Sequence, residues 1–63
     1  MKRRLLVKAI KSIGYREARD DGDHTIFEKE GGPPLQVPRH HEVNNNTARK
    51  ILKTAGAEDE LKR

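Results

Sequence analysis

The sequence contains no cysteine and no tryptophan, and it has only one tyrosine and one phenylalanine. The absence of cysteine excludes disulfides and thiolate metal sites, and with them the usual frameworks of small secreted proteins. No apolar run approaches the ~18 residues that a membrane span requires. Met-Lys-Arg-Arg at the start is not followed by the continuous apolar segment of a signal peptide. We therefore expect a soluble, intracellular protein that does not enter the membrane.

Hydrophobic residues are also scarce, at 32% of the chain against 38% charged residues. This composition is close to that of disordered proteins, so the spacing of the apolar residues has to decide whether the chain folds. At 63 residues there is room for one small domain, which buries only about 60% of the surface of its unfolded chain. We expect a single domain over residues 1–63, with residues 57–63 as a charged tail.

Two segments carry apolar residues at positions i, i+3, i+4 and i+7, the spacing of an amphipathic helix. The two sets are Leu6, Ala9, Ile10 and Ile13, and Ala48, Ile51, Leu52 and Ala55. The pattern predicts one helix from Lys2 to Ile13 and a second that begins at Thr47. Gly14 and Gly56 are expected to end them, because glycine adopts the left-handed conformation without a side-chain clash.

The residues before the second helix, Asn44 to Thr47, are all of the type that caps helices by accepting orphan backbone N–H bonds. Asn46 is also able to take the left-handed conformation at lower cost than most residues.

Three short strands are expected between the helices. Tyr15–Asp20 is the first, with Tyr15, Glu17 and Arg19 on one of its faces. Asp21-Gly22 is a two-residue hairpin signal that leads into a second strand from His24 to Glu30. Leu35–Pro38 is the third, and it is expected at an edge because proline lacks a ladder donor.

Together these elements predict an α+β fold of order α-β-β-β-α. A three-stranded antiparallel sheet would carry both helices on one face, since each helix has an apolar stripe that needs a surface to cover. This is the order of elements in double-stranded-RNA-binding domains.

Charge is unevenly distributed along the chain. Residues 1–13 carry five positive and no negative side chains, residues 14–30 three against six, residues 31–56 four against one, and residues 57–63 two against three. These differences (+5, −3, +3 and −1) sum to the net charge of +4. The basic segments are consistent with a polyanionic partner and equally with solvated helix surfaces.

Three blocks of sequence resemble the HicA toxins of bacterial toxin-antitoxin pairs. They are Gly22-Asp23-His24-Thr25-Ile26-Phe27, Val37-Pro38-Arg39-His40, and the segment from Thr47 to Gly56 that reads Thr-Ala-Arg-Lys-Ile-Leu-Lys-Thr-Ala-Gly. The resemblance extends from the first helix to Gly56. The sequence departs from the commoner pattern at Asp23, where serine usually precedes the histidine, and at Asn46, where glycine often precedes the threonine.

The resemblance implies a fold like that of double-stranded-RNA-binding domains and ribonuclease activity on mRNA in a bacterial or archaeal cytoplasm. It also implies a HicB-like antitoxin as protein partner in a hetero-oligomeric complex. His24 occupies the motif position of the catalytic histidine on the second strand. Histidine suits this role because it both accepts and donates protons near neutral pH.

RNA contributes its own nucleophile, the 2′-hydroxyl, so a ribonuclease needs an acid, a base and positive charge for the phosphate. The candidate RNA-binding residues are Lys2, Arg3, Lys8, Lys11, His40, Arg49, Lys50 and Lys53. No metal site or other cofactor is expected, because the three histidines lack ligand spacing. Asp23 is expected to serve as a turn residue rather than as a partner of the imidazole, because neighbouring strand residues point to opposite faces.

Two alternatives remain open at this stage. The chain would serve as a non-catalytic RNA-binding module if its basic helices recognise RNA by shape. The second alternative is that the basic surface binds only protein partners.

Overall fold

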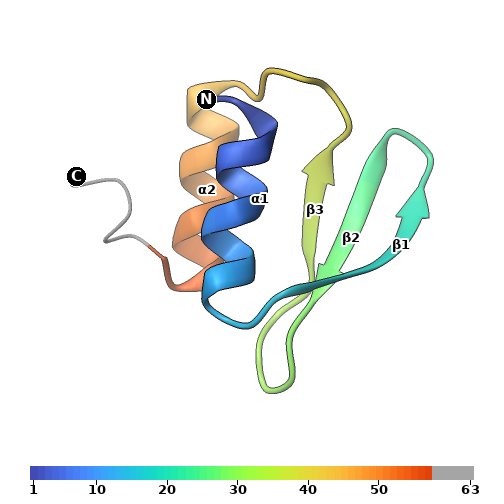
Figure 1. The fold of residues 1–63 in the computed structure, drawn as a ribbon, viewed down its shortest axis with the longest axis vertical. Coiled ribbons are helices and arrows are strands. Elements are labelled where there is room, and N and C mark those ends of the chain that lie inside the picture. Colours follow the sequence, from blue (N-terminus) through green and yellow to red (C-terminus); the bar gives the residue numbers. More distant parts are fainter. Residues whose placement is uncertain (58–63) are drawn as a thin grey trace.

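The computed structural model describes residues 1–57. They form α1 (Arg3–Ser12), β1 (Arg16–Asp21), β2 (His24–Glu28), β3 (Leu35–Pro38) and α2 (Asn45–Ala55), as Figure 1 shows. The predicted order α-β-β-β-α is confirmed. The charged tail that was expected from residue 57 lies almost entirely outside the described residues. No helix within residues 1–57 combines the length and the apolar character needed to cross a membrane.

The three strands form one antiparallel sheet in the order β1-β2-β3, so β3 is an edge strand as expected. The two helices lie side by side and run in the same direction, with β3 as their nearest strand and β1 as the most distant (Figure 1). All six residues of β1 are exposed. The helices therefore cover β2 and β3, while β1 extends beyond them.

One hydrophobic core lies between the helices and the sheet. Phe27 on β2 and Val37 on β3 are fully buried, together with Leu6 and Ile10 of α1 and Leu52 of α2. These residues belong to one cluster, which means that the apolar stripes of both helices are covered by the same face of the sheet. Burying a side chain of this size stabilises the folded state by about 1.5–3 kcal/mol.

Both helices end within two residues of the predicted positions. Asn44 caps α2 by accepting a hydrogen bond from the backbone N–H of Asn46 at 2.8 Å, so α2 begins before Thr47. Gly56 ends α2 in the left-handed conformation, with φ of 83°. The left-handed conformation considered for Asn46 is wrong: within residues 1–57 only glycines have positive φ. A capping asparagine earlier in the run makes Asn46 part of the helix.

The register of β1 differs from the expected alternation because the strand contains an irregularity between Glu17 and Arg19. Glu17 pairs with Phe27, whereas Arg19 pairs with Ile26, the next residue of β2. Two residues of β1 therefore span one step of β2, which is the geometry of a β-bulge. Placing Glu17 and Arg19 on one face was wrong, since the bulge turns them to opposite faces.

The hairpin turn lies one residue later than predicted. Asp21 is still paired, opposite His24, so the two central residues of the turn are Gly22 and Asp23. Gly22 has φ of 62°, whereas Asp23 has no positive φ. Positive φ at the first central position alone is typical of a type II′ turn, which glycine at that position favours. The second strand ends at Glu28, two residues before the predicted Glu30.

Candidate active site

His24 is the first residue of β2 and lies immediately after the hairpin turn. It is held on both sides, because it pairs with Asp21 of β1 and with Pro38 of β3. Its side chain is half-buried. A titratable group is therefore presented to solvent from the central strand of the sheet, where the backbone is fixed by two neighbours.

The imidazole of His24 points away from the helices. Phe27 belongs to the core shared with α1 and α2, and Thr25 lies on the same side of β2 as Phe27, because alternate strand residues share a face. His24, Ile26 and Glu28 consequently lie on the opposite side, which we call the open face. In agreement, Ile26 is not a member of the core cluster, although only 4% of it is exposed.

Thr25, next to His24, is fixed from the helix side of the sheet. Its hydroxyl donates a hydrogen bond to Asp20 Oδ1 at 3.0 Å and accepts one from Arg3 Nη2 at 3.0 Å. Arg3 Nε also donates to the carbonyl oxygen of Pro38 at 2.9 Å. Thr25 is 2% exposed, so these bonds satisfy a buried hydroxyl.

Three chain segments meet at this end of the sheet, at the top of Figure 1. The backbone N–H of Arg39 donates to the carbonyl oxygen of Asp23 at 2.9 Å, which joins the end of β3 to the hairpin turn. The N–H of Arg3 donates to the carbonyl oxygen of His41 at 2.9 Å, which joins α1 to the loop before α2. Asp23 is a turn residue, as expected, and none of the side-chain hydrogen bonds found in residues 1–57 joins it to His24.

The structure brings only some of the predicted RNA-binding residues to the end of the sheet where His24 lies. Lys2 is the residue before α1 and forms an isolated antiparallel β-bridge with Glu42 through its backbone, and Arg3 and His40 lie in the segments just described. Two donors of the Arg3 guanidinium already bind the protein. These residues are close to the strand end that carries His24.

The remaining predicted cations lie along the helices. Lys11 and Lys53 are in the last turns of α1 and α2, at the opposite end of the molecule from His24 (Figure 1). Lys50 borders a shallow depression next to Leu35, at the end of β3 that is distant from Pro38. Arg49 is exposed on α2. Lys11, Lys50 and Lys53 therefore do not form one cluster with His24.

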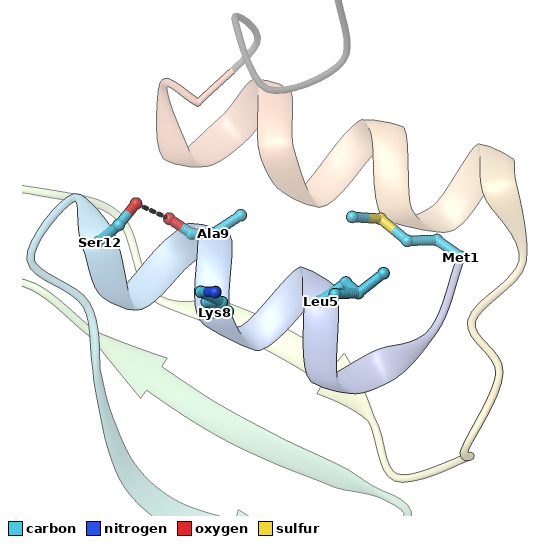
Figure 2. A pocket seen from close by; sticks show the side chains of 5 residues that line it. All are labelled: Met1, Leu5, Lys8, Ala9 and Ser12. Atoms are coloured by element: carbon cyan, nitrogen blue, oxygen red, sulfur yellow. Dashed lines mark hydrogen bonds between the residues drawn. The ribbon is translucent and has the colours of Figure 1, made fainter. Parts of the chain in front are cut away.

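Lys8 lines a separate hollow on α1, shown in Figure 2. The other lining residues are Met1, Leu5, Ala9 and Ser12, none of which belongs to the sheet. Leu5 is 47% exposed, and the Ser12 hydroxyl donates to the carbonyl oxygen of Ala9 at 2.6 Å. This surface is mainly apolar, Lys8 is the charged side chain among its lining residues, and it is not part of the site around His24.

Arg19 is a candidate that was not selected from the sequence. Its pairing with Ile26 places it on the open face with His24. Its guanidinium forms an ion pair with Glu28 at 3.6 Å, and its side chain is 63% exposed. The uniform alternation assumed for β1 hid its relation to His24, because the bulge that reverses the face carries no glycine to signal it.

Metal ligands do not converge in the part of the chain that the structure describes. Among residues 1–57, no group of three or more histidine, aspartate or glutamate side chains is placed to hold a metal ion. The side chains around His24 thus offer proton transfer and hydrogen bonding as their chemistry.

Comparison with known proteins agrees with this fold. The family model described as the HicA toxin of bacterial toxin-antitoxin systems matches residues 3–57. A chain of a toxin-antitoxin complex from Streptococcus pneumoniae is similar, with 35% identity, a TM-score of 0.79 and coverage of 89% of this chain and 97% of that chain. No curated protein matches the sequence. With the family model covering all five secondary-structure elements, the chain belongs to the HicA toxins of bacterial toxin-antitoxin systems.

Proposed function

We propose that this toxin is an endoribonuclease that cleaves mRNA with His24 as general acid or base. The observation that carries the proposal is the position of His24, half-buried at the start of the central strand and facing solvent on the open face. A proton-transfer group has to approach its substrate within about 3 Å in a fixed orientation, and pairing on both sides fixes the strand that carries it.

The reaction uses the 2′-hydroxyl of the RNA as nucleophile. The 2′-oxygen attacks the adjacent phosphorus and loses its proton, the bond from phosphorus to the 5′-oxygen breaks, and that oxygen takes up a proton. His24 performs one of these two proton transfers, which typically contributes a rate factor of about 10²–10⁴. The 2′-oxygen stays bonded to phosphorus, so the expected products end in a 2′,3′-cyclic phosphate and a 5′-hydroxyl.

The protein partner is an antitoxin, and we infer that it resembles HicB. Support comes from the similar Streptococcus pneumoniae chain, whose structure is that of a toxin-antitoxin complex. A stable complex buries on the order of 800 Å² on each partner, which is enough to cover the open face of so small a sheet. The antitoxin neutralises the toxin by covering His24, without a change in the toxin fold.

Expression of the wild-type chain beside the His24→Ala variant tests the enzymatic proposal. Wild type is expected to arrest bacterial growth with loss of mRNA, and the variant to lose both effects. Circular dichroism of both proteins shows whether the variant keeps its fold, which is expected because His24 lies outside the core cluster. A folded His24→Ala variant that is as toxic as wild type would place the proton transfer elsewhere.

A non-catalytic RNA-binding module is the second candidate, and the exposed cations of the helices favour it. Lys8 and Lys11 on α1 and Lys50 and Lys53 on α2 are all exposed, and they lie on elements that can contact RNA by shape. RNA that binds the purified wild-type protein and stays intact would support this function. Cleaved RNA with cyclic phosphate ends would rule it out.

A further inference from the structure

We propose that the scissile strand of the RNA crosses the open face of the sheet, where Arg19, released from Glu28, binds the phosphate beside His24. This inference rests on the proposed function, because it uses His24 to locate the scissile phosphate. Substrate binding is thereby assigned to a residue of β1 and not to the cations of the helices.

The open face brings a guanidinium to the same side of the sheet as the imidazole of His24. Pairing places Arg19 and Asp21 of β1, His24 and Ile26 of β2, and Gln36 of β3 on this side of the sheet. Arg19 is nearer to His24 in the pairing than Arg16, the other cation of β1 on this side, which lies opposite Glu28. A guanidinium suits this task, because its planar fork binds two phosphate oxygens at once.

Arg19 lies diagonally between two residues of β2. It is opposite Ile26, so His24 and Glu28 are its diagonal neighbours in either direction. Diagonal neighbours on one face are about 7–8 Å apart, within reach of an arginine side chain. In this structure the guanidinium points toward Glu28, with 3.6 Å between Arg19 Nη1 and Glu28 Oε2.

The ion pair with Glu28 is weak enough to be exchanged for a phosphate. The side chains of Arg19 and Glu28 are 63% and 46% exposed, so water and salt screen the attraction. A phosphate beside His24 carries a full negative charge and offers two oxygens. Rotation of the Arg19 side chain from one diagonal to the other is sufficient, with no change in the backbone.

The β-bulge is what places Arg19 on this face. With a regular alternation Arg19 would share a face with Glu17, which pairs with Phe27 and therefore lies on the helix side. Bulges re-aim side chains in this way and occur often beside active sites. The irregularity in β1 thus has a direct consequence for the surroundings of His24.

Ile26 gives Arg19 a fixed base. Only 4% of Ile26 is exposed, although it lies outside the core cluster and no helix covers this face. Arg19 and Gln36 are its directly paired neighbours on either side. Their aliphatic stems are about 5 Å away at Cβ, so they cover Ile26 while their polar ends stay in water.

The helix cations do not reach a phosphate that His24 can act on. Lys11 and Lys53 are at the other end of the helices, and Lys50 borders the distant end of β3. The helices lie on the opposite face of the sheet from His24. A phosphate within hydrogen-bond distance of the imidazole is therefore separated from Lys11 and Lys53 by the sheet, and it lies at the other end of β3 from Lys50.

Binding of a single-stranded RNA to the catalytically blocked His24→Ala protein tests the proposal. Arg19→Met keeps the apolar stem over Ile26 and removes the charge, and Arg4→Met, an exposed residue of α1, is the matched control. In the His24→Ala background Arg19→Met is expected to weaken binding about tenfold or more. It should also reduce the slope of log affinity against log salt by about 0.7, the value for one contact to single-stranded nucleic acid. Arg4→Met should change neither.

Glu28→Gln separates substrate binding from a purely structural role of Arg19. It frees the guanidinium and is expected to strengthen RNA binding, whereas Arg19→Met weakens it. If the ion pair only stabilised the sheet, both variants would weaken binding together, and the proposal would be overturned. It would also be overturned if Arg19→Met behaved like Arg4→Met while Lys50→Gln or Lys53→Gln lowered the affinity.

The same experiments distinguish failure of this inference from failure of the proposed function. If His24→Ala cleaves RNA as fast as wild type but Arg19→Met still weakens binding, the enzymatic role of His24 is wrong and the binding face stands. If His24→Ala abolishes cleavage and Arg19→Met binds normally, the catalytic role stands and the binding face is wrong.

Discussion

Arg3 and Thr25 are joined by a hydrogen bond of 3.0 Å from the guanidinium to the hydroxyl, which ties the first turn of α1 to β2. Arg3 also donates to the carbonyl oxygen of Pro38, the residue that pairs with His24. Thr25 is the chain neighbour of His24. One arginine on the helix side of the sheet therefore fixes both backbone segments that hold the histidine on the open face.

Removing the Arg3 guanidinium is expected to weaken both the fold and the site. Arg3→Met should lower the free energy of unfolding by about 1–2 kcal/mol, because it removes two hydrogen bonds from a charged donor at a partly exposed position. Thr25→Val removes the acceptor with little change of shape. Urea denaturation of both single variants and the double variant measures the coupling, expected at about 0.5–1.5 kcal/mol. Strictly additive effects would show that the bond does not contribute.

Activity supplies the second measurement for Arg3. If Arg3 acts by positioning β2 and β3, Arg3→Met should lower kcat for RNA cleavage. The same change in the His24→Ala background should then alter the affinity for RNA little. A phosphate-binding role, which the sequence suggested, predicts the reverse: weaker RNA binding and a shallower salt dependence.

Gly22 is required because of its backbone conformation in the turn, and not because a side chain would clash there. Its φ is +62°, yet a Cβ added there would meet nothing within 4 Å. Gly22→Ala should therefore cost about 1–2 kcal/mol of folding free energy through backbone conformation alone. Gly22→Asn should cost less, since asparagine tolerates this region.

Asp23→Ala is the matched control for the turn, because Asp23 has no positive φ. It should be close to neutral in thermal or chemical denaturation. A loss of stability for Asp23→Ala equal to that for Gly22→Ala would mean that the conformation at Gly22 is not the limiting feature.

The sequence was sufficient for the helices and for the order of the elements. Both apolar stripes have the spacing of one helical face, and the residues Leu6, Ile10, Ile51 and Leu52 are buried as that spacing requires. Gly56 ends α2 in the left-handed conformation for the reason expected, the absence of a Cβ. Local chemistry determines these features, so they can be predicted from short segments.

The faces of the sheet were not predictable in the same way. The side of β2 that faces the core depends on packing against both helices, and Ile26 and Phe27 are equally plausible core residues from sequence alone. The bulge in β1 depends on pairing with β2, and nothing in Arg-Glu-Ala-Arg-Asp-Asp indicates it. Pairing between the strands thus determines both the face on which His24 lies and the position of Arg19 beside it.

RNA cleavage is expected to persist in EDTA. Hard divalent cations need several oxygen ligands, and no group of three suitable side chains converges within residues 1–57, even though Asp21 lies opposite His24. Product formation with and without chelator measures this, with a metal-dependent nuclease as positive control. Activity that disappears on chelation and returns with a divalent cation would contradict the expected proton-transfer chemistry.

Antitoxin and RNA should compete for the open face. If a HicB-like antitoxin covers His24, it also covers Arg19, because both side chains lie on the same side of the sheet at diagonal positions. The antitoxin should therefore displace labelled single-stranded RNA from the His24→Ala protein, with a competitive dependence on concentration seen by fluorescence anisotropy.

Rising salt should slow association of the two proteins if the antitoxin surface is acidic, because long-range attraction accelerates the encounter. Arg19→Met should then slow association at low salt, and Arg4→Met serves as the control. A ternary complex of toxin, antitoxin and RNA, or a complex structure with His24 open to a phosphate, would show that neutralisation works by another route.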